Sequence, residues 1–135
     1  MRKFRSAGVN KKEEVKFTKF EEITAWQKAR VLTSDVYTIT RQKPFCQDYG
    51  LVDQIRRASG SIMHNIAEGF DAGSNKEFVR FLRYSFRSAS EVQSQLYIAL
   101  DASYIDQSEF ELLYEQSTEI KKIIAGLIKY LLSQQ

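Results

Sequence analysis

Apolar residues recur every third or fourth position through long stretches of this chain, and almost nothing interrupts them. Spacings of three and four place side chains on one face of an α-helix. The 135 residues include only one proline and six glycines, the residue types that most disfavour a helix interior. The pattern therefore predicts long helices, and the scarcity of turn-forming residues disfavours a β-sandwich.

The stretches have similar lengths and are separated by short polar segments. Helices of this kind, joined by short turns, pack with alternating direction into a bundle. The sequence therefore predicts an all-α, antiparallel, up-down-up-down four-helix bundle. The expected helices cover about residues 21–41, 48–70, 74–103 and 106–135.

Several residues mark the ends of these helices. Pro44 lacks a backbone donor and ends the first helix, while Gly69 or Gly73 suits a left-handed cap after the second. Ser74 and Asp106 each stand three residues before a glutamate, the spacing of a capping box. Four separate helices are therefore expected rather than one or two longer ones.

Residues 1–19 are polar and basic and show no sustained helical period. We expect a flexible N-terminal arm over residues 1–19 and a single bundle domain over residues 20–135. The arm offers a basic element that could follow a phosphate backbone or serve only as a solubilising tail. Its positive residues include Arg2, Lys3, Arg5, Lys11 and Lys12.

Composition excludes several classes of protein. The single Cys46 rules out an internal disulfide, and one histidine, His64, gives no zinc-type ligand set, so we expect no metal and no cofactor. No apolar run approaches the roughly 20 residues that span a bilayer, and the start does not resemble a signal peptide. We expect a cytoplasmic protein, and its net charge of +3 permits an anionic partner.

Positive side chains form a row on the third predicted helix. Arg80, Arg83 and Arg87 lie three and four positions apart, and Lys76 extends the row by one turn. No acidic residue interrupts the row before Glu91, and like charges at this spacing weaken a helix slightly. An uncompensated row of arginines favours a phosphate-bearing or acidic partner, because the guanidinium group binds two oxygens at once.

The sequence leaves two alternatives to an external partner for this row. The row is either a solvated face or is paired with glutamates of the fourth helix, namely Glu109, Glu111, Glu115 and Glu119. The aromatic residues that can be placed fall at core or core-flanking positions: Tyr37, Phe78, Phe81, Phe86 and Phe110. With no exposed aromatic platform expected, any nucleic acid would be bound through its backbone with little sequence specificity.

The second predicted helix has a polar stripe beside its apolar one. Arg57, Ser61, Asn65 and Glu68 follow each other at helical spacing, and we expect them to form a semi-buried polar network. The alternative is a small active site of His64, Asn65 and Glu68, which an open pocket around these side chains would favour. No nucleophile, base and orienting group can be assembled from the sequence, so no catalytic residue is predicted.

Small residues lie on the opposite side of this helix. Gly60 and Ala67 are seven positions apart, near Asp53 and Arg56, and small side chains admit another backbone closely. From the sequence alone they are either exposed without consequence or part of a contact between copies of the chain.

Three segments resemble a known family, the bacterial proteins encoded in 23S rRNA intervening sequences. They are FEEITAWQKA, YGLVDQIRRASGSIMHNIAEGF and KEFVRFLRYSFRSASEVQSQL, and the resemblance extends from about residue 20 to residue 132. Relatives usually have proline where Met63 stands and a small polar residue where His64 stands, so a straighter second helix is expected here.

The resemblance implies a four-helix bundle that assembles into a ring, typically a homopentamer, which favours the contact at Gly60 and Ala67. A related accessory protein of diversity-generating retroelements forms such a ring and associates with reverse transcriptase and nucleic acid. Most members have no established role. We therefore expect a non-enzymatic oligomeric scaffold that associates with RNA, DNA or a nucleic-acid-handling partner through its basic surface. The alternative is a protein–protein adaptor that binds no nucleic acid, and neither membrane nor small-molecule substrate is expected.

Overall fold

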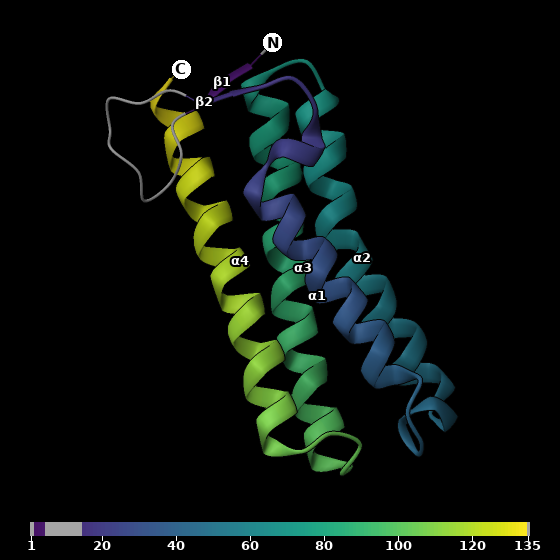
Figure 1. The fold of residues 1–135 in the computed structure, drawn as a ribbon. Helices are drawn as coiled ribbons and strands as arrows, with labels where there is room; N and C mark the ends of the chain where they lie inside the picture. Colours follow the sequence, from purple (N-terminus) through teal and green to yellow (C-terminus); the bar gives the residue numbers. More distant parts are fainter. Residues whose placement is uncertain (1, 5–14, 135) are drawn as a thin grey trace.

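Four long helices lie side by side in the computed structural model, which describes residues 2–4 and 15–134 (Figure 1). Successive helices run in opposite directions, and α1 also packs against α4. The predicted all-α, up-down-up-down bundle is confirmed. Its helices are α1 (Thr24–Thr40), α2 (Tyr49–Asp71), α3 (Asn75–Asp101) and α4 (Gln107–Ser133).

The predicted apolar stripes form the core. Their central side chains are fully buried, and each large aliphatic side chain buried in this way contributes about 1.5–3 kcal/mol to folding. Packing of these stripes therefore supplies most of the driving force for folding. Side chains with almost no exposed area include Leu32 of α1, Ile55 and Ile62 of α2, Leu82 and Leu96 of α3, and Ile120 and Ile124 of α4.

Side-chain caps hold the helix starts. The Ser74 hydroxyl accepts a hydrogen bond from the Glu77 amide at 3.2 Å, and Asp106 accepts one from the Glu109 amide at 2.7 Å. Glu109 returns the bond by accepting from the Asp106 amide at 3.0 Å, so α4 begins with a complete capping box. The box expected at Ser74 is only half formed, because the Glu77 carboxylate turns to Arg80 instead.

Glycines act at two points near the turn between α2 and α3. Gly73 has φ of +90°, a left-handed conformation that confirms it as the residue ending α2. Gly69 lets α2 approach α3, since a Cβ built there would lie 2.7 Å from Cβ of Phe81 and 3.0 Å from a ring carbon of Phe78. The helix itself runs unbroken through Met63.

Polar side chains fix the register of neighbouring helices by bonding to backbone carbonyls. The Ser85 hydroxyl of α3 donates to the Ile62 carbonyl at 2.8 Å. The Thr33 hydroxyl of α1 is shared between the Ala29 carbonyl of its own helix, at 2.8 Å, and the Ser59 carbonyl of α2, at 3.1 Å. Gln93 of α3 donates to the carbonyl of Tyr114 on α4 at 3.2 Å. Each of these donors is thereby satisfied, and sliding one helix along another would break the bonds.

The entry to the bundle differs from the sequence-based expectation. The first helix starts at Thr24 rather than near residue 21, because Ile23 is extended with φ of −77° and ψ of 122°. A 3₁₀ turn, η1 (Phe20–Glu22), precedes it, and the strands β1 (Arg2–Phe4) and β2 (Val15–Phe17) pair antiparallel. Of the predicted basic arm, Arg5, Lys11 and Lys12 lie outside the described residues.

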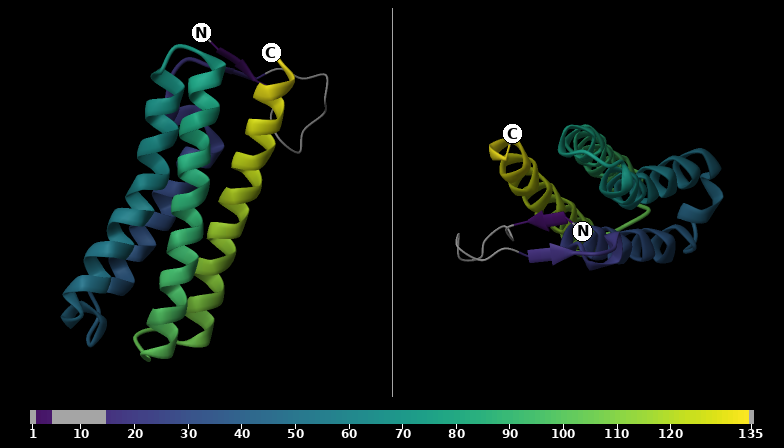
Figure 2. Two further views of the ribbon diagram at one scale, coloured as in Figure 1. Left: turned by 180° about the vertical axis from the view of Figure 1, so that it is seen from behind. Right: turned by 90° about the horizontal axis from the view of Figure 1, so that it is seen from above.

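The chain's end and the strands share one end of the bundle. Figure 2 shows β1 and β2 near the C-terminus of α4, at the same end as the turn between α2 and α3. Described basic positions of the arm, Arg2 and Lys3, therefore lie at the end where α3 begins.

Aromatic packing joins the connections at the opposite end. Tyr104, between α3 and α4, donates a hydrogen bond from its hydroxyl to Asp48 at 2.9 Å, and its ring stacks on Phe45 at 5.0 Å. Phe45 belongs to the 3₁₀ turn η2 (Phe45–Gln47) between α1 and α2. The hydrogen bond to Asp48, with desolvation, raises the pKa of Tyr104 above its ordinary value.

Candidate functional site

Positive charge collects at one end of the α3–α4 hairpin. Lys76, Arg80, Arg83 and Arg87 all lie in the first half of α3. Because α4 runs antiparallel to α3, its C-terminal half is beside this row, and that half has lysines and no acidic residue: Lys121, Lys122 and Lys129. The acidic residues of α4 occupy its N-terminal half, beside the end of α3.

This layout excludes pairing of the row with α4, one of the alternatives that the sequence left open. The glutamates considered as partners for the row lie toward the other end of the hairpin. Within residues 2–4 and 15–134 the ion pairs are Lys28 with Glu119, Arg57 with Asp53, and Arg80 with Glu77. No glutamate of α4 pairs with an arginine of the row in this part of the chain.

The helix dipoles bear on only some of the charges of α3 and α4. A helix dipole favours acidic residues near the N-terminus and basic residues near the C-terminus. This influence is confined to the first and last turns of a helix. The first turn of α4 contains Glu109 and that of α3 contains Glu77, as the rule favours. The arginines of the row lie beyond the first turn of α3, so the dipole does not account for their presence.

Arg80 is not free, which corrects the expectation of an uncompensated row. Its Nη2 lies 2.7 Å from Oε2 of Glu77, its Nη1 donates to the Tyr84 hydroxyl at 3.1 Å, and its guanidinium lies 4.8 Å from the Phe81 ring centroid. The bonds to Glu77 and then Tyr84 raise the pKa of Arg80. The sequence contained the acidic partner at position 77, three residues before Arg80.

The remaining members of the row, Lys76, Arg83 and Arg87, are exposed. None of them forms an ion pair with any described residue. Arg87 lies at 6.0 Å from the ring centroid of Tyr84. The row therefore presents three cationic side chains whose charges no carboxylate of the described chain compensates.

An aromatic side chain stands inside the row, where none was expected to be exposed. Tyr84 is 37% exposed and lies between Arg80 and Arg87, four residues after the first and three before the second. Tyr37, expected near the core, is 40% exposed and lies under the Arg56 guanidinium at 4.4 Å. Phe78 and Phe110 are buried as expected, and Phe81 and Phe86 are half-buried.

The polar stripe of α2 forms a smaller network than the sequence indicated. Asn65 donates to the carbonyl and the hydroxyl of Ser61, both at 2.9 Å, and Ser88 of α3 donates to the Ser61 hydroxyl at 3.0 Å. Arg57 instead bonds to Asp53 at 3.0 Å, in an exposed pair. Glu68 is exposed and has no hydrogen bond to the stripe within the described chain. Among the described residues, this network therefore joins α2 to α3 through the bond between Ser61 and Ser88, and Asn65 bonds within α2.

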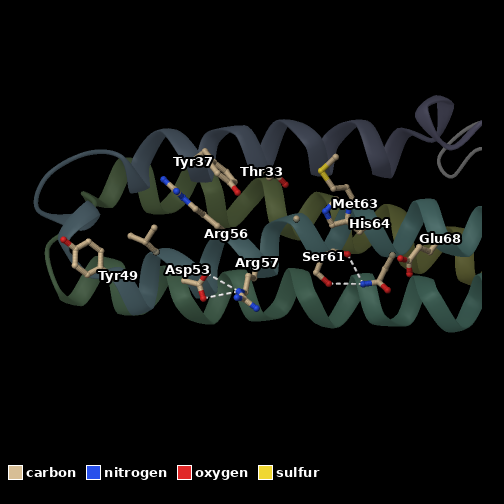
Figure 3. Close-up of a pocket in the computed structure, with 13 residues that line it drawn as sticks. Thr33, Tyr37, Tyr49, Asp53, Arg56, Arg57, Ser61, Met63, His64 and Glu68 are labelled. Carbon is tan, nitrogen blue, oxygen red and sulfur yellow. Dashed lines mark hydrogen bonds and ion pairs between the residues drawn. The ribbon is translucent and has the colours of Figure 1, made fainter.

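The outer face of α2 lines an open hollow of about 790 Å³ (Figure 3). Thr33 and Tyr37 of α1 form one side, and α2 provides the rest. Gly60 lies in its lining, and the nearest atoms to a Cβ built there are those of the His64 ring, at 3.6 Å and 3.8 Å. Ala67 is half-buried and is not part of the lining. The lining residues of α2 include Tyr49, Asp53, Arg56, Arg57, Gly60, Met63, His64, Asn65 and Glu68.

His64, Asn65 and Glu68 thus face an open hollow, the condition that would favour an active site. Catalysis by a nucleophile also needs an activating base in hydrogen-bond contact. No hydrogen bond among the described residues links these three side chains with one another, and the Asn65 amide is taken by Ser61. The described part of the chain also holds no group of three potential metal ligands.

Comparison with known proteins decides the family. Residues 21–126 match the family described as 23S rRNA-intervening sequence protein. The chain belongs to this family. The resemblance recognised in the sequence is thereby confirmed, over most of the bundle.

A solved structure shows the same fold for a related protein. A protein with unknown function from the S23 ribosomal protein family of Bacteroides thetaiotaomicron VPI-5482 matches with a TM-score of 0.72 and 24% sequence identity. The match covers 78% of this chain and 95% of that chain. No curated protein matches the sequence. Among the described helices of this family member, none is long and apolar enough to cross a bilayer.

Proposed function

We propose that this member of the 23S rRNA-intervening sequence family is a non-enzymatic scaffold that binds the phosphate backbone of RNA or DNA. The binding surface is the basic end of the α3–α4 hairpin. One observation carries the proposal: Lys76, Arg83 and Arg87 are exposed, have no described carboxylate partner, and lie beside the lysine-bearing half of α4. An external anion would remove the repulsion among these charges.

The scaffold is proposed to act as a ring of copies, five in a pentamer. The hollow on α2 supports this, because charges of both signs line it. Its lining includes the carboxylates of Asp53 and Glu68 and the guanidinium groups of Arg56 and Arg57. In a ring each copy uses two different faces, so this hollow would receive a different face of the next copy, one whose charges complement its carboxylates and guanidinium groups. Gly60 has no side chain, and the nearest atoms to a Cβ built there belong to the His64 ring. A ring would bring several basic rows together and multiply a weak binding site.

The binding proposal is tested by a mobility-shift titration with labelled RNA and DNA at about 50 mM salt and then at rising salt. Replacing Arg80, Arg83 and Arg87 with alanine should abolish most of the shift. A matched control, alanine at the exposed Arg30, Arg41 and Lys43, removes the same formal charge elsewhere and should retain it. Absence of any shift for the wild-type protein, or an unchanged shift for the first variant, contradicts the proposal.

A protein–protein adaptor is the competing function, and the 790 Å³ hollow is the observation that favours it. A pull-down from the native cell extract, performed with and without nuclease, separates the two functions. Partners that depend on nucleic acid are lost after nuclease treatment. Partners that survive it show an adaptor.

The assembly is tested by light scattering. Gly60→Leu projects a bulky side chain into the hollow and should lower the mass of the assembly toward that of the 15.7 kDa chain. Ser94→Leu adds the same side chain at an exposed position of α3, outside the lining, and should leave the mass unchanged. A wild-type protein that is monomeric at all concentrations would overturn the ring.

A further inference from the structure

A second, smaller hollow lies within the basic end, between α3 and α4. It has a volume of about 320 Å³ and is lined by Arg83, Phe86, Arg87, Ala125 and Ile128. Small-molecule sites span about 300–1,000 Å³, so this hollow is at the small end of that range and suits one compact group. A helix or a duplex edge is too large for it.

The hollow has an apolar wall and a cationic rim. Phe86 is half-buried, and Ile128 retains 9% of its exposure. Arg83 and Arg87 are exposed at the rim without a described ion pair, on successive turns of α3. On the other side, the Lys121 ammonium lies 4.9 Å from the Phe86 ring centroid and bonds to Gln93 at 3.1 Å. Apolar surface and positive charge therefore meet within one helical turn.

This combination matches the two parts of a nucleotide. A nucleobase is flat, largely apolar on its faces, and stacks on aromatic rings or guanidinium planes. Its phosphates are anionic and bind arginine in two-pronged fashion. Side chains four residues apart on a helix have Cβ atoms about 5–6 Å apart, so Arg83 and Arg87 can bind phosphates on either side of one base.

We infer that this hollow binds an unpaired base of a single-stranded nucleic acid, while Arg83 and Arg87 bind its flanking phosphates. The inference rests on the proposed function and specifies its ligand as single-stranded rather than duplex. In a duplex each base is stacked between neighbours and only its edges are accessible, so no base enters the hollow. The half-exposed Tyr84, next to Arg87, extends the same surface by one further ring.

Fluorescence anisotropy with the full chain tests this inference. The probes are a labelled oligouridylate, an abasic strand of the same length and backbone charge, and an RNA duplex of that length. The oligouridylate should bind about 5- to 10-fold more tightly than the abasic strand, the effect of stacking about one base.

Ala125→Leu is the diagnostic variant, because Ala125 is exposed, lines the hollow and bears no charge. Leucine is also a good helix former, so the fold should be kept. The variant should lose the preference for the oligouridylate and keep its affinity for the abasic strand. Ser94→Leu, which lies outside the hollow, is the matched control and should keep both.

The outcomes separate this inference from the proposed function. Equal binding of the oligouridylate and the abasic strand, or a preference that survives Ala125→Leu, overturns the base site and leaves backbone binding intact. Tighter binding of the duplex than of either strand also overturns it. Failure of all three probes to bind overturns the proposed function as well.

Discussion

The two ends of this bundle differ in charge and in how their helices meet. At the end with the α2–α3 turn, the row on α3 lies beside the lysines of α4 and near the described strands of the arm. At the other end the first half of α4 carries glutamates, and the ring centroids of Tyr97, Phe110 and Tyr114 lie 4.8–5.8 Å from one another. At the acidic end Glu109 completes the capping box of α4, whereas at the basic end Lys76, Arg83 and Arg87 have no described carboxylate partner. The basic end is therefore the stronger candidate for binding an external anion.

Reversing the charge of the row on α3 should have the largest effect on RNA binding. Replacing Arg83 and Arg87 with glutamate should weaken RNA binding by about 100-fold or more, because each charged hydrogen bond contributes about 1.5–3 kcal/mol. Replacing Glu111 and Glu115 with lysine, at the acidic end, should leave binding equal or tighter. Anisotropy titrations at one low salt concentration compare the two variants. Similar losses in both would show that net charge, rather than its position, controls binding.

The close packing of the basic end should be broken by Gly69→Ala. The added Cβ would lie 2.7 Å from Cβ of Phe81, so α2 and α3 must separate. We expect the free energy of unfolding to fall by about 1–3 kcal/mol. Urea denaturation measures the change, with Gly50→Ala as the control, since a Cβ there meets only an Asp48 oxygen at 4.0 Å. Equal stability of Gly69→Ala and the wild-type protein would show that α2 and α3 can move apart at this point without loss of stability.

The starts of α3 and α4 should differ in what their caps contribute. Asp106→Ala removes a complete capping box and should lower the free energy of unfolding by about 1–2 kcal/mol. Ser74→Ala removes half a box and should cost about 0.5–1 kcal/mol. Urea denaturation of both variants checks the order. A larger loss for Ser74→Ala would contradict the view that Glu77 serves Arg80 rather than the cap.

Freeing Arg80 from its ion pair should strengthen RNA binding at the basic end slightly. Glu77→Gln removes the carboxylate that bonds to Arg80 and should tighten RNA binding by about two- to threefold, because exposed ion pairs are weak. The slope of log K against log salt concentration should also become steeper by up to about 0.9, the value for one additional phosphate contact. The control is Asp53→Asn, which releases Arg57 away from the row. The same gain from Asp53→Asn would mean that any lost carboxylate has this effect.

The smallest expected effect is the change of stability with pH that arises from the hydrogen bond between Tyr104 and Asp48 at the acidic end. The pKa of Tyr104 is raised by Asp48, so above pH about 10 the unfolded chain loses the phenolic proton before the folded chain does. The stability gained from this bond is complete below that pH and is lost as the pH rises through the raised pKa. Thermal melting of wild-type and Tyr104→Phe proteins should converge at alkaline pH. Parallel curves would show that the bond to Asp48 is not the source of the shift.

The helices were predictable to within a few residues because their signals are local. Apolar spacing, Asp106 with Glu109, and Gly73 all act within one turn of the chain. The start of α1 was less predictable, since the extended Ile23 is buried against the bundle and no capping side chain marks the helix start.

The candidate site was predictable as a set of positions but not as a set of contacts. Glu77 had two possible partners within reach, the Ser74 cap and Arg80, and only the structure shows which one it takes. Tyr84 could have been noticed from its spacing to Arg80 and Arg87. The hollow beside Phe86 could not, because Ala125 and Ile128 come from another helix and local periodicity does not set the register of α4 against α3.

The hydroxyl bonds between helices have a consequence for how far such sequences can diverge. Ser85 donates to the carbonyl of residue 62, and Thr33 to that of residue 59, and a carbonyl is present whatever amino acid stands there. The side chains at the accepting positions can therefore change while the hydrogen bonds, and the register of the helices that these bonds set, are kept. A fold held in this way needs to keep only one partner of each pair, which is compatible with a TM-score of 0.72 at 24% identity.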